Sequence, residues 1–345
     1  MDKWKLNNLD LNYNELIIDP KINENKKINK NYYKASVIHK LVREQAKKLL
    51  HNNTKYWNIV ESIETNIIKY TTKESRLDYF NNIQSLNGIA FPIGLSVNNI
   101  AAHDTSYFYD NRILYKDDIV KVDIGVIYDG CIIDSAFTEI VDNENSEYEP
   151  LIESTKDATY SAIVASGVDV RLYEISEIIQ EVIKSYEIEI NNNIIAINPI
   201  AGIGGHNICG TKLHGGKLIL CVPNEIQENM KMEEDEIFAI ETFATTGTSN
   251  INYDNDNITH CSYNTEKINN NAKLKSWLEK RKDLPFNSYW CNEIGYNNKD
   301  MLKINKFINI YPPLICEKNS KTSQLEHTIY IRDKGVEILS LGQDY

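Results

Sequence analysis

Hydrophobic residues recur at helical spacing in several stretches of the chain. Within residues 32–50, the apolar positions Val37, Leu41, Ala46 and Leu49 stand among charged residues at near-helical intervals, which predicts an amphipathic helix. Similar patterns predict helices at about residues 55–70, 150–166 and 171–186. Residues 1 to about 28 are polar and rich in Asn and Lys, so we expect a partly disordered leader there rather than a domain.

Two runs of β-branched residues predict a β-hairpin. The runs cover residues 119–127 and 131–138, and Tyr128-Asp129-Gly130 separates them. The Asp-Gly pair tolerates the positive φ angles of the tight turns that join antiparallel strands. Apolar residues occupy both faces of the two runs, which is typical of strands that are buried on both sides.

The remaining pattern is mixed and favours the α+β class. Apolar strands are expected near residues 194–197, 237–242 and 327–331, and they do not alternate strictly with helices. Between about 263 and 310 the sequence becomes rich in Asn and Lys, with short helical patterns at 274–282 and 301–308. We interpret this stretch as a helical insertion between strands, within a single domain that covers residues 29–345.

Composition narrows the class of function. The net charge of -12 opposes attraction to nucleic acid or anionic lipid, so neither is expected as a partner. The six cysteines are scattered without a CxxC pair, as in proteins of a reducing compartment. The sequence contains neither an apolar run of membrane-spanning length nor a signal-peptide core. We therefore expect a cytoplasmic protein.

Each arm of the predicted hairpin carries one aspartate. Asp123 and Asp134 are eleven positions apart, and residues at odd separation across a two-residue turn project from the same face. One reading is that this face is simply solvated. The apolar neighbours on both faces favour burial instead, and two buried carboxylates on one face are costly unless a cation lies between them. A metal ion is the usual cation.

Three further residues of metal-ligand type stand in unusual contexts. His206 follows two glycines, although a lone histidine beside glycines is more often a loop residue. Glu241 interrupts the apolar run 237–243, and Glu326 opens the last predicted strand. An unpaired carboxylate in such a run is expensive to bury. Each signal alone is weak, because an acid-rich chain supplies such residues by accident.

The ordered set is more specific than its members. Asp123, Asp134, His206, Glu241 and Glu326, in this order, resemble the five metal ligands of the methionine aminopeptidases of the pita-bread fold. The resemblance runs from about residue 32 to residue 345. Together with the insertion, several further blocks resemble the type 2 enzymes in particular: Gly88–Pro92, Ala101–His103, Lys121–Gly125, Ile133–Thr138, Ala239–Phe243, Tyr311–Leu314, Leu325–Thr328 and Asp344-Tyr345.

This resemblance implies a pita-bread fold of the α+β class with a type 2 helical insertion. It implies hydrolytic removal of the initiator methionine from nascent proteins, by a hydroxide that bridges two divalent metal ions. Asp123 would chelate one ion, Asp134 and Glu326 would bridge both, and His206 with Glu241 would complete the second. Glu241 is also the implied proton acceptor. Four carboxylates and one imidazole suit Mn, Fe, Co or Zn.

Substrate contacts are implied in the same way. His103, 20 residues before Asp123, and His214, 8 residues after His206, look like the family's two substrate-facing histidines. His103 would also be the residue that the spiro-epoxide inhibitor fumagillin alkylates. On sequence alone both are ordinary surface histidines. The apolar methionine slot is expected from Phe91, Leu213 and Tyr311, for each of which core packing is the simpler explanation.

The chain departs from the type 2 pattern at two places. Ile127-Tyr128 stands where His or Gln is followed by an aliphatic residue, and Tyr263 stands where a histidine that helps line the methionine pocket usually follows Ser262. The leader also lacks the long basic and acidic blocks of many eukaryotic relatives. The resemblance implies proximity to the ribosome, but without these blocks it implies no ribosome-docking role for the leader, and we expect a monomer.

Two other functions are compatible with this reading. An X-Pro aminopeptidase or prolidase of the same fold would use the same five ligands, but the insertion and the Tyr311 block favour a type 2 methionine aminopeptidase. A non-enzymatic adaptor that binds proteins is the second alternative. Such relatives have lost metal ligands, whereas all five are present in this chain.

Overall fold

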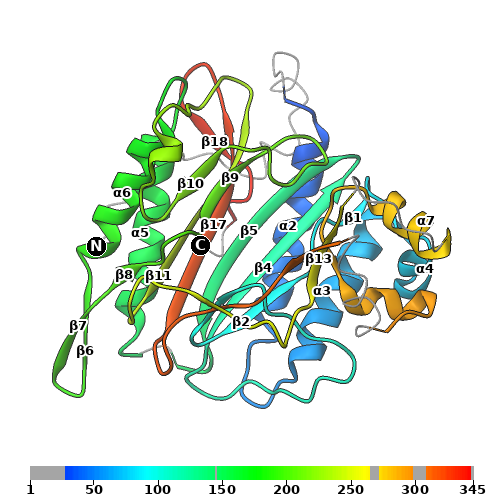
Figure 1. The fold of residues 1–345 in the computed structure, drawn as a ribbon, viewed down its shortest axis with the longest axis horizontal. Helices are drawn as coiled ribbons and strands as arrows, with labels where there is room; N and C mark the ends of the chain where they lie inside the picture. Colours follow the sequence, from blue (N-terminus) through cyan, green and yellow to red (C-terminus); the bar gives the residue numbers. More distant parts are fainter. Residues whose placement is uncertain (1–27, 144–145, 265–271, 298–307, 343–345) are drawn as a thin grey trace.

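Two hydrogen-bonded sheets form the centre of the computed structural model, which describes residues 28–143, 146–264, 272–297 and 308–342 (Figure 1). In the four-stranded sheet, β4 pairs with β5 along one edge and with β1 and β2 along the other. The six-stranded sheet has the order β10-β9-β11-β17-β18, and β8 pairs with the end of β11. The strands are β1 (Gly88–Ile89), β2 (Gly94–Val97), β4 (Ile119–Tyr128), β5 (Cys131–Ile140), β8 (Asn198–Pro199), β9 (Gly204–Ile208), β10 (Leu218–Leu220), β11 (Ile237–Thr245), β17 (Thr322–Ile331) and β18 (Val336–Ile338).

A pair of helices covers each sheet. Helices α2 (Asn31–Lys47) and α3 (Tyr56–Thr71) pack against β1, β4 and β5, whereas α5 (Glu149–Ala165) and α6 (Leu172–Lys184) pack against the six-stranded sheet. Figure 1 shows the first pair in blue and the second in green. The apolar faces of the two pairs contribute to two separate buried clusters. The four predicted helices are thus confirmed, and the molecule has two halves.

The predicted hairpin forms with its two-residue turn. Strands β4 and β5 pair from Ile119 opposite Ile140 to Tyr128 opposite Cys131. The turn residues Asp129 and Gly130 have φ angles of 47° and 80°, the positive values that a primed turn requires. In this register Asp123 lies opposite Ala136 and Asp134 lies opposite Gly125, so the two aspartates are diagonal neighbours on one face.

Hydroxyl side chains join the two halves where β5 meets β17. The Thr328 hydroxyl accepts from the Asp134 amide at 2.8 Å and donates to the Asp134 carbonyl at 2.6 Å. The Ser135 hydroxyl donates to the Glu326 carbonyl at 2.7 Å. These bonds satisfy backbone groups that are buried between the sheets. We call this contact between β5 and β17 the seam.

The seam also explains why β17 is longer than predicted. The expected strand began at residue 327, but β17 begins at Thr322 and all of its residues are buried. Its first residues are polar, which hides the strand from a hydrophobic pattern. They are buried because partners lie across the seam: the Thr138 hydroxyl donates to the Gln324 carbonyl at 2.8 Å and accepts from its amide at 2.9 Å.

The predicted insertion is only partly helical in the described residues. Its first helical piece is confirmed as α7 (Ala272–Arg281), but a strand and a 3₁₀ helix follow. The second piece, at 301–308, lies outside the described residues except for Ile308, which begins a strand. The strand β13 (His260–Tyr263) precedes the insertion and pairs with two of its strands, β14 (Phe286–Asn287) and β15 (Ile308–Tyr311), to form a three-stranded sheet. The 3₁₀ helix covers Ser288–Ile294.

Short elements complete the fold. The strand predicted near residue 194 is confirmed as β7, which forms a hairpin with β6.

The predicted leader up to residue 27 lies outside the described residues. None of the described helices has the length and apolar character that crossing a bilayer requires. The remaining elements are α4 (Arg76–Asn81), β3 (Ile100–Ala102), β6 (Glu187–Ile190), β7 (Asn193–Ala196), β12 (Asn252–Tyr253), β16 (Leu314–Ile315) and a 3₁₀ turn at Glu225–Gln227.

Candidate metal centre and substrate cavity

All ten site residues that were predicted from the sequence line one cavity of about 540 Å³. Both sheets contribute to its wall, and so do β13 and β15 on either side of the insertion. The acids and His206 come from β4, β5, β9, β11 and β17, which are far apart in the sequence. The fold therefore gathers the proposed metal ligands and the proposed substrate contacts in one place.

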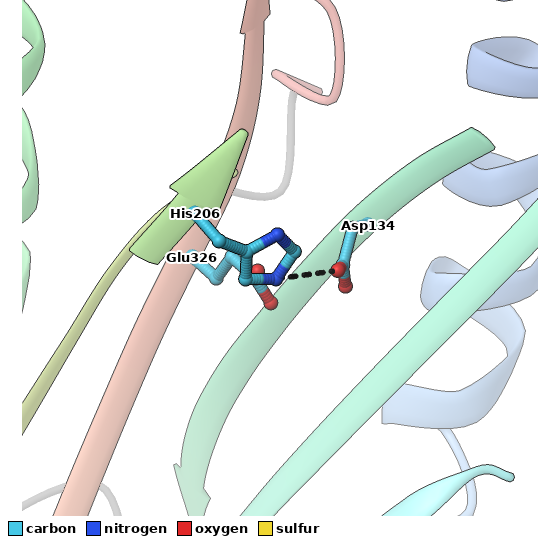
Figure 2. Close-up of side chains that lie close together, drawn as sticks. All are labelled: Asp134, His206 and Glu326. Atoms are coloured by element: carbon cyan, nitrogen blue, oxygen red, sulfur yellow. Dashed lines mark ion pairs between the residues drawn. The ribbon is translucent and has the colours of Figure 1, made fainter. Parts of the chain in front are cut away.

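Four carboxylates and one imidazole converge near the seam. Asp134, His206 and Glu326 offer ligand atoms that lie within 4.8 Å of one another, and so do Asp123, Glu241 and Glu326. Figure 2 shows His206 and Glu326 facing Asp134, with 3.6 Å between the His206 Nε2 and Asp134 Oδ2 atoms. Because Glu326 belongs to both groups, the arrangement offers two neighbouring ion positions that share it.

Which of the two ions each of the other four residues would bind stays a prediction. The sequence resemblance places Glu241 with His206 on one ion and makes Asp134 a second bridge. In the structure the Glu241 carboxylate is grouped with Asp123 and Glu326, whereas Asp134 is grouped with His206 and Glu326.

The charges of these residues fit a pair of cations. One oxygen each of Asp123, Asp134 and Glu326 is buried without a hydrogen-bond donor in the described part of the chain. Burial raises the pKa of Asp123 to about 6. Burial, reinforced by repulsion between the neighbouring carboxylates, raises the pKa values of Asp134, Glu241 and Glu326 well above their usual range. Divalent ions would favour the ionised forms and supply the missing partners, and this oxygen-rich donor set with one imidazole suits Mn, Fe, Co or Zn.

His206 is prepared to act as a neutral ligand. Burial and, second, the neighbouring His214 lower the pKa of His206 to about 3, so its ring is uncharged at neutral pH. The rings of the two histidines lie 4.1 Å apart. The Nδ1 atom of His206 is 3.5 Å from the Asn207 carbonyl, which favours a proton on Nδ1. The lone pair is then on Nε2, the nitrogen that faces Asp134.

The glycines before His206 are required by close strand packing rather than by a loop. His206 lies on β9, opposite Ala239 of β11. A Cβ atom at Gly205 would lie 2.3 Å from the Ala239 carbonyl oxygen, and one at Gly204 would lie 2.2 Å from the Ile219 carbonyl oxygen. Side chains at these positions would push β9 away from its neighbours and move the imidazole.

Gln324 is a site residue that the sequence analysis missed. Its Nε2 atom donates to Glu241 Oε1 at 2.7 Å and lies 3.3 Å from Asp123 Oδ2. It therefore connects acids from the two halves of the molecule. Strand periodicity contained the signal, because Gln324 stands two positions before Glu326 and residues two apart share a face.

His260, which was not predicted as a site residue, lies beside His103 in the cavity. Burial lowers the pKa of His103 to about 4, and its Nδ1 atom lies 3.3 Å from the Pro312 carbonyl. The ring of His260, on β13, is centred 5.6 Å from that of His103. The sequence indicates Tyr263 as the replacement for a pocket histidine, whereas His260 was not among the predicted site residues. Both residues line the cavity, and His260 supplies an imidazole on the same strand.

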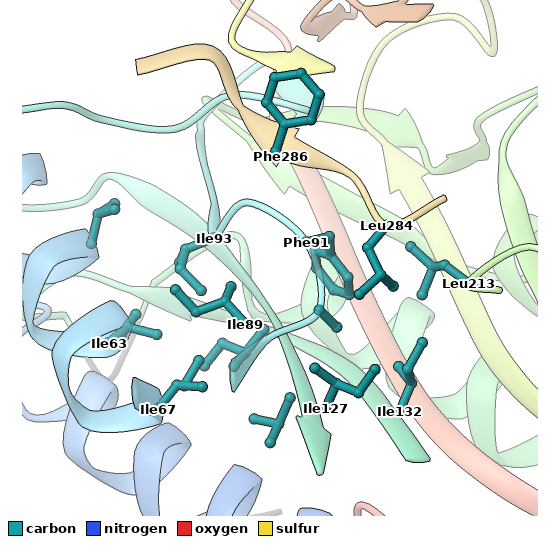
Figure 3. Close-up of a cluster of buried hydrophobic side chains, with 14 of the residues drawn as sticks. Ile63, Ile67, Ile89, Phe91, Ile93, Ile127, Ile132, Leu213, Leu284 and Phe286 are labelled. Atoms are coloured by element: carbon teal, nitrogen blue, oxygen red, sulfur yellow. The ribbon is translucent and has the colours of Figure 1, made fainter. Parts of the chain in front are cut away.

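Phe91, Leu213 and Tyr311 form an apolar part of the cavity. Phe91 and Leu213 belong to one buried cluster together with Leu284 (Figure 3). The Phe91 ring lies over Gly125, where an added Cβ atom would be 2.2 Å from the ring. The Tyr311 hydroxyl forms a 2.9 Å hydrogen bond with Ser262, so its ring can face the cavity without an unsatisfied polar group.

The raised carboxylate pKa values predict how the protein behaves without metal. Unfolded carboxyls titrate near pH 4, so between that pH and the raised folded pKa values the folded state binds more protons. Stability of chelated protein should therefore fall as the pH rises from about 4 through 6. Asp134→Asn removes one of these buried, mutually repelling carboxyl groups and should stabilise the chelated protein at pH 7.5, by on the order of 1 kcal/mol.

The same variant should be less stable than wild type when Mn²⁺ is present, because it loses a ligand. Thermal melting with chelator and with Mn²⁺ measures both effects. Equal destabilisation of Asp134→Asn in the two conditions would contradict this account of the acids.

Comparison with known proteins identifies the family of this chain. Residues 30–333 match the model of metallopeptidase family M24. The chain is 37% identical over 326 residues to methionine aminopeptidase 2 of Kluyveromyces lactis, covering 90% of this chain and 75% of that protein. It is 34% identical over 330 residues to methionine aminopeptidase 2 of Yarrowia lipolytica, covering 92% and 67%.

A solved structure shows the same fold. The methionine aminopeptidase of Thermotoga maritima superposes with a TM-score of 0.62 at 18% identity, over 92% of this chain and 98% of that one. The two helix-covered halves are thus those of the pita-bread fold, as the sequence resemblance predicted. With the family match over most of the chain and the two relatives above 30% identity, the chain belongs to metallopeptidase family M24.

Proposed function

We propose that this chain is a type 2 methionine aminopeptidase, which hydrolyses the peptide bond after an N-terminal methionine of nascent polypeptides. The observation that carries the proposal is the convergence of the five ligand-type residues in a cavity that also contains an apolar slot. The curated relatives called methionine aminopeptidase 2, which match about nine-tenths of the chain, support the type 2 assignment.

The acids and His206 would hold two divalent ions, for which Mn, Fe, Co and Zn are the candidates. When bound, such ions lower the pKa of a water molecule from 15.7 toward about 7 and polarise the carbonyl group of the substrate. Glu241 is the proton acceptor in this proposal. Gln324 donates to its Oε1 atom and so holds the carboxylate in place beside the proposed ions.

Two neutral histidines would contact the reacting peptide. A proton on Nδ1 of His103 donates to the Pro312 carbonyl, which leaves Nε2 of this ring unprotonated as an acceptor for a substrate amide. His214 packs against His206 and therefore lies beside the proposed metal ligands. Its imidazole is placed to donate a hydrogen bond to the oxygen that gains charge in the tetrahedral intermediate.

The apolar slot would select the side chain of the first residue. Phe91, Leu213 and Tyr311 offer it an apolar surface, and burying an unbranched side chain such as methionine gains about 1.5–3 kcal/mol. This gain gives a finite preference over similar side chains. The X-Pro peptidase alternative uses the same ligands, but here β13 and β15 add His260 and Tyr311 to the cavity wall. The adaptor alternative is disfavoured because no ligand is missing.

Substrate preference tests the proposal directly. Metal-loaded protein should cleave Met-Ala-Ser at least about a hundredfold faster than Ala-Pro-Ser, measured as kcat/KM by release of the first residue. Met-Ala-Ser should also be cleaved much faster than Met-Leu-Ser, because family members accommodate only a small second side chain beside the metals. Faster cleavage of Ala-Pro-Ser would favour the X-Pro peptidase, and no cleavage of either would favour the adaptor.

Covalent labelling tests the position of His103. The spiro-epoxide fumagillin should add once per chain, because a neutral imidazole with an unprotonated nitrogen can open the epoxide. Intact-protein mass spectrometry and peptide mapping should place the adduct on His103 and find none in His103→Asn. An adduct on His260, whose ring is also neutral and nearby, would instead give His260 the role that is proposed for His103.

A further inference from the structure

Arg281, the last residue of α7, has a fully buried guanidinium group. The group has five N–H donors, and backbone carbonyls accept from all of them. Nε donates to Pro285 at 3.0 Å, Nη1 to Ile89 at 2.7 Å and to Gln84 at 3.5 Å, and Nη2 to Ala90 at 2.7 Å and to Pro285 at 2.5 Å. Within the described residues no carboxylate forms an ion pair with it. This charge is used to bind backbone rather than an acid.

The carbonyls belong to two segments of the chain that both contribute residues to the cavity wall. Ile89 and Ala90 directly precede Phe91, which lines the proposed slot. Pro285 also lines the cavity and directly precedes β14, the strand that pairs with β13 beside His260. Arg281 therefore ties the Phe91 segment to the insertion, although its own side chain does not line the cavity.

Strand β4 also holds Phe91 in place, through contacts at Gly125. The amide of Ala90 donates to the Gly125 carbonyl at 2.9 Å, and the Phe91 ring occupies the space where a side chain at residue 125 would lie. The ring thus packs on β4, and the guanidinium bonds to the Ile89 and Ala90 carbonyls hold the backbone that carries Phe91. Hydrogen bonds from a charged donor are about twice as strong as neutral ones, so this anchor resists displacement.

We propose that Arg281 is a positioning residue that sets the width of the apolar slot and thereby the selectivity for the N-terminal side chain. This inference rests on the proposed aminopeptidase function. Arg281 acts through the placement of Phe91 and Pro285 and not through the metal ligands. Its removal should therefore weaken the discrimination between methionine and other apolar first residues, and it should leave metal binding intact.

The test compares Arg281→Met and Arg281→Lys with wild type on Met-Ala-Ser and Leu-Ala-Ser. In Arg281→Met the preference for methionine in kcat/KM should fall about fivefold or more, mainly through a higher KM for the methionine peptide. Lysine keeps the charge but offers three donors instead of five, so Arg281→Lys should recover part of the preference. The metal content of both variants, measured by elemental analysis, should equal that of wild type.

A matched control separates positioning from general stability. Arg76 bonds to the buried Glu64 and packs on Trp57 and Phe80, and it does not line the cavity. Arg76→Met should lower the melting temperature and keep the wild-type preference for methionine. An equal change of preference in Arg76→Met would overturn the inference, because the effect would not be specific to Arg281.

The remaining outcomes are also decisive. If Arg281→Met folds with the wild-type preference, or if it does not fold and a folded Arg281→Lys keeps that preference, Arg281 is structural only and the inference fails. A wild-type protein that cleaves no methionine peptide would instead overturn the proposed function, and this inference with it.

Discussion

The side-by-side placement of β5 and β17 is the constraint on which the rest of the site depends. Asp134 and Glu326 are on these two strands, and hydroxyl groups of Ser135 and Thr328 join the strands through bonds to the backbone of the same two acids. The bonds that close the seam thus also fix the positions of the carboxylates. Repulsion between the carboxylates opposes the contact between β5 and β17. Cations between the carboxylates would turn this net repulsion into attraction.

Each half of the molecule provides only part of the site. Asp123 and Asp134 come from the hairpin beneath α2 and α3, whereas His206, Glu241 and Glu326 come from the sheet beneath α5 and α6. Each half has its own apolar cluster, so each can hold its strands rigidly. Metal affinity then depends on how the halves meet, and Gln324 reinforces that contact by bonding to acids of both.

Local patterns predicted much of this architecture. The hairpin, its Asp-Gly turn and the shared face of Asp123 and Asp134 followed from a period of two and from turn chemistry. Glu241 was visible because a carboxylate inside an apolar run requires a partner. The assignment of the four acids and His206 to one centre, however, came from family resemblance, since no local rule brings β5, β9 and β17 together.

Residues with long-range partners were not predictable in this way. Gln324 looks like a loop residue because its partner Thr138 lies across the seam, and Thr322 does so because its amide and hydroxyl donate to the distant Asn98 carbonyl. Ile308–Tyr311 is a strand because it pairs with β13. His260 has no local feature that distinguishes it from a core histidine. Arg281 stands near the end of a predicted helix, where a cation is favourable without any buried partner, so the local pattern gives no sign of its burial. Its burial follows only from the carbonyls that surround it.

The number of divalent ions bound per chain tests the central claim most directly. After loading with Mn²⁺ and removal of free metal, elemental analysis should find two ions in the wild-type chain. Glu326→Gln should bind fewer than two under the same conditions, because both ligand groups share Glu326. Two ions retained in Glu326→Gln, or none in a wild-type protein that cleaves a methionine peptide, would contradict a shared dinuclear centre at the seam.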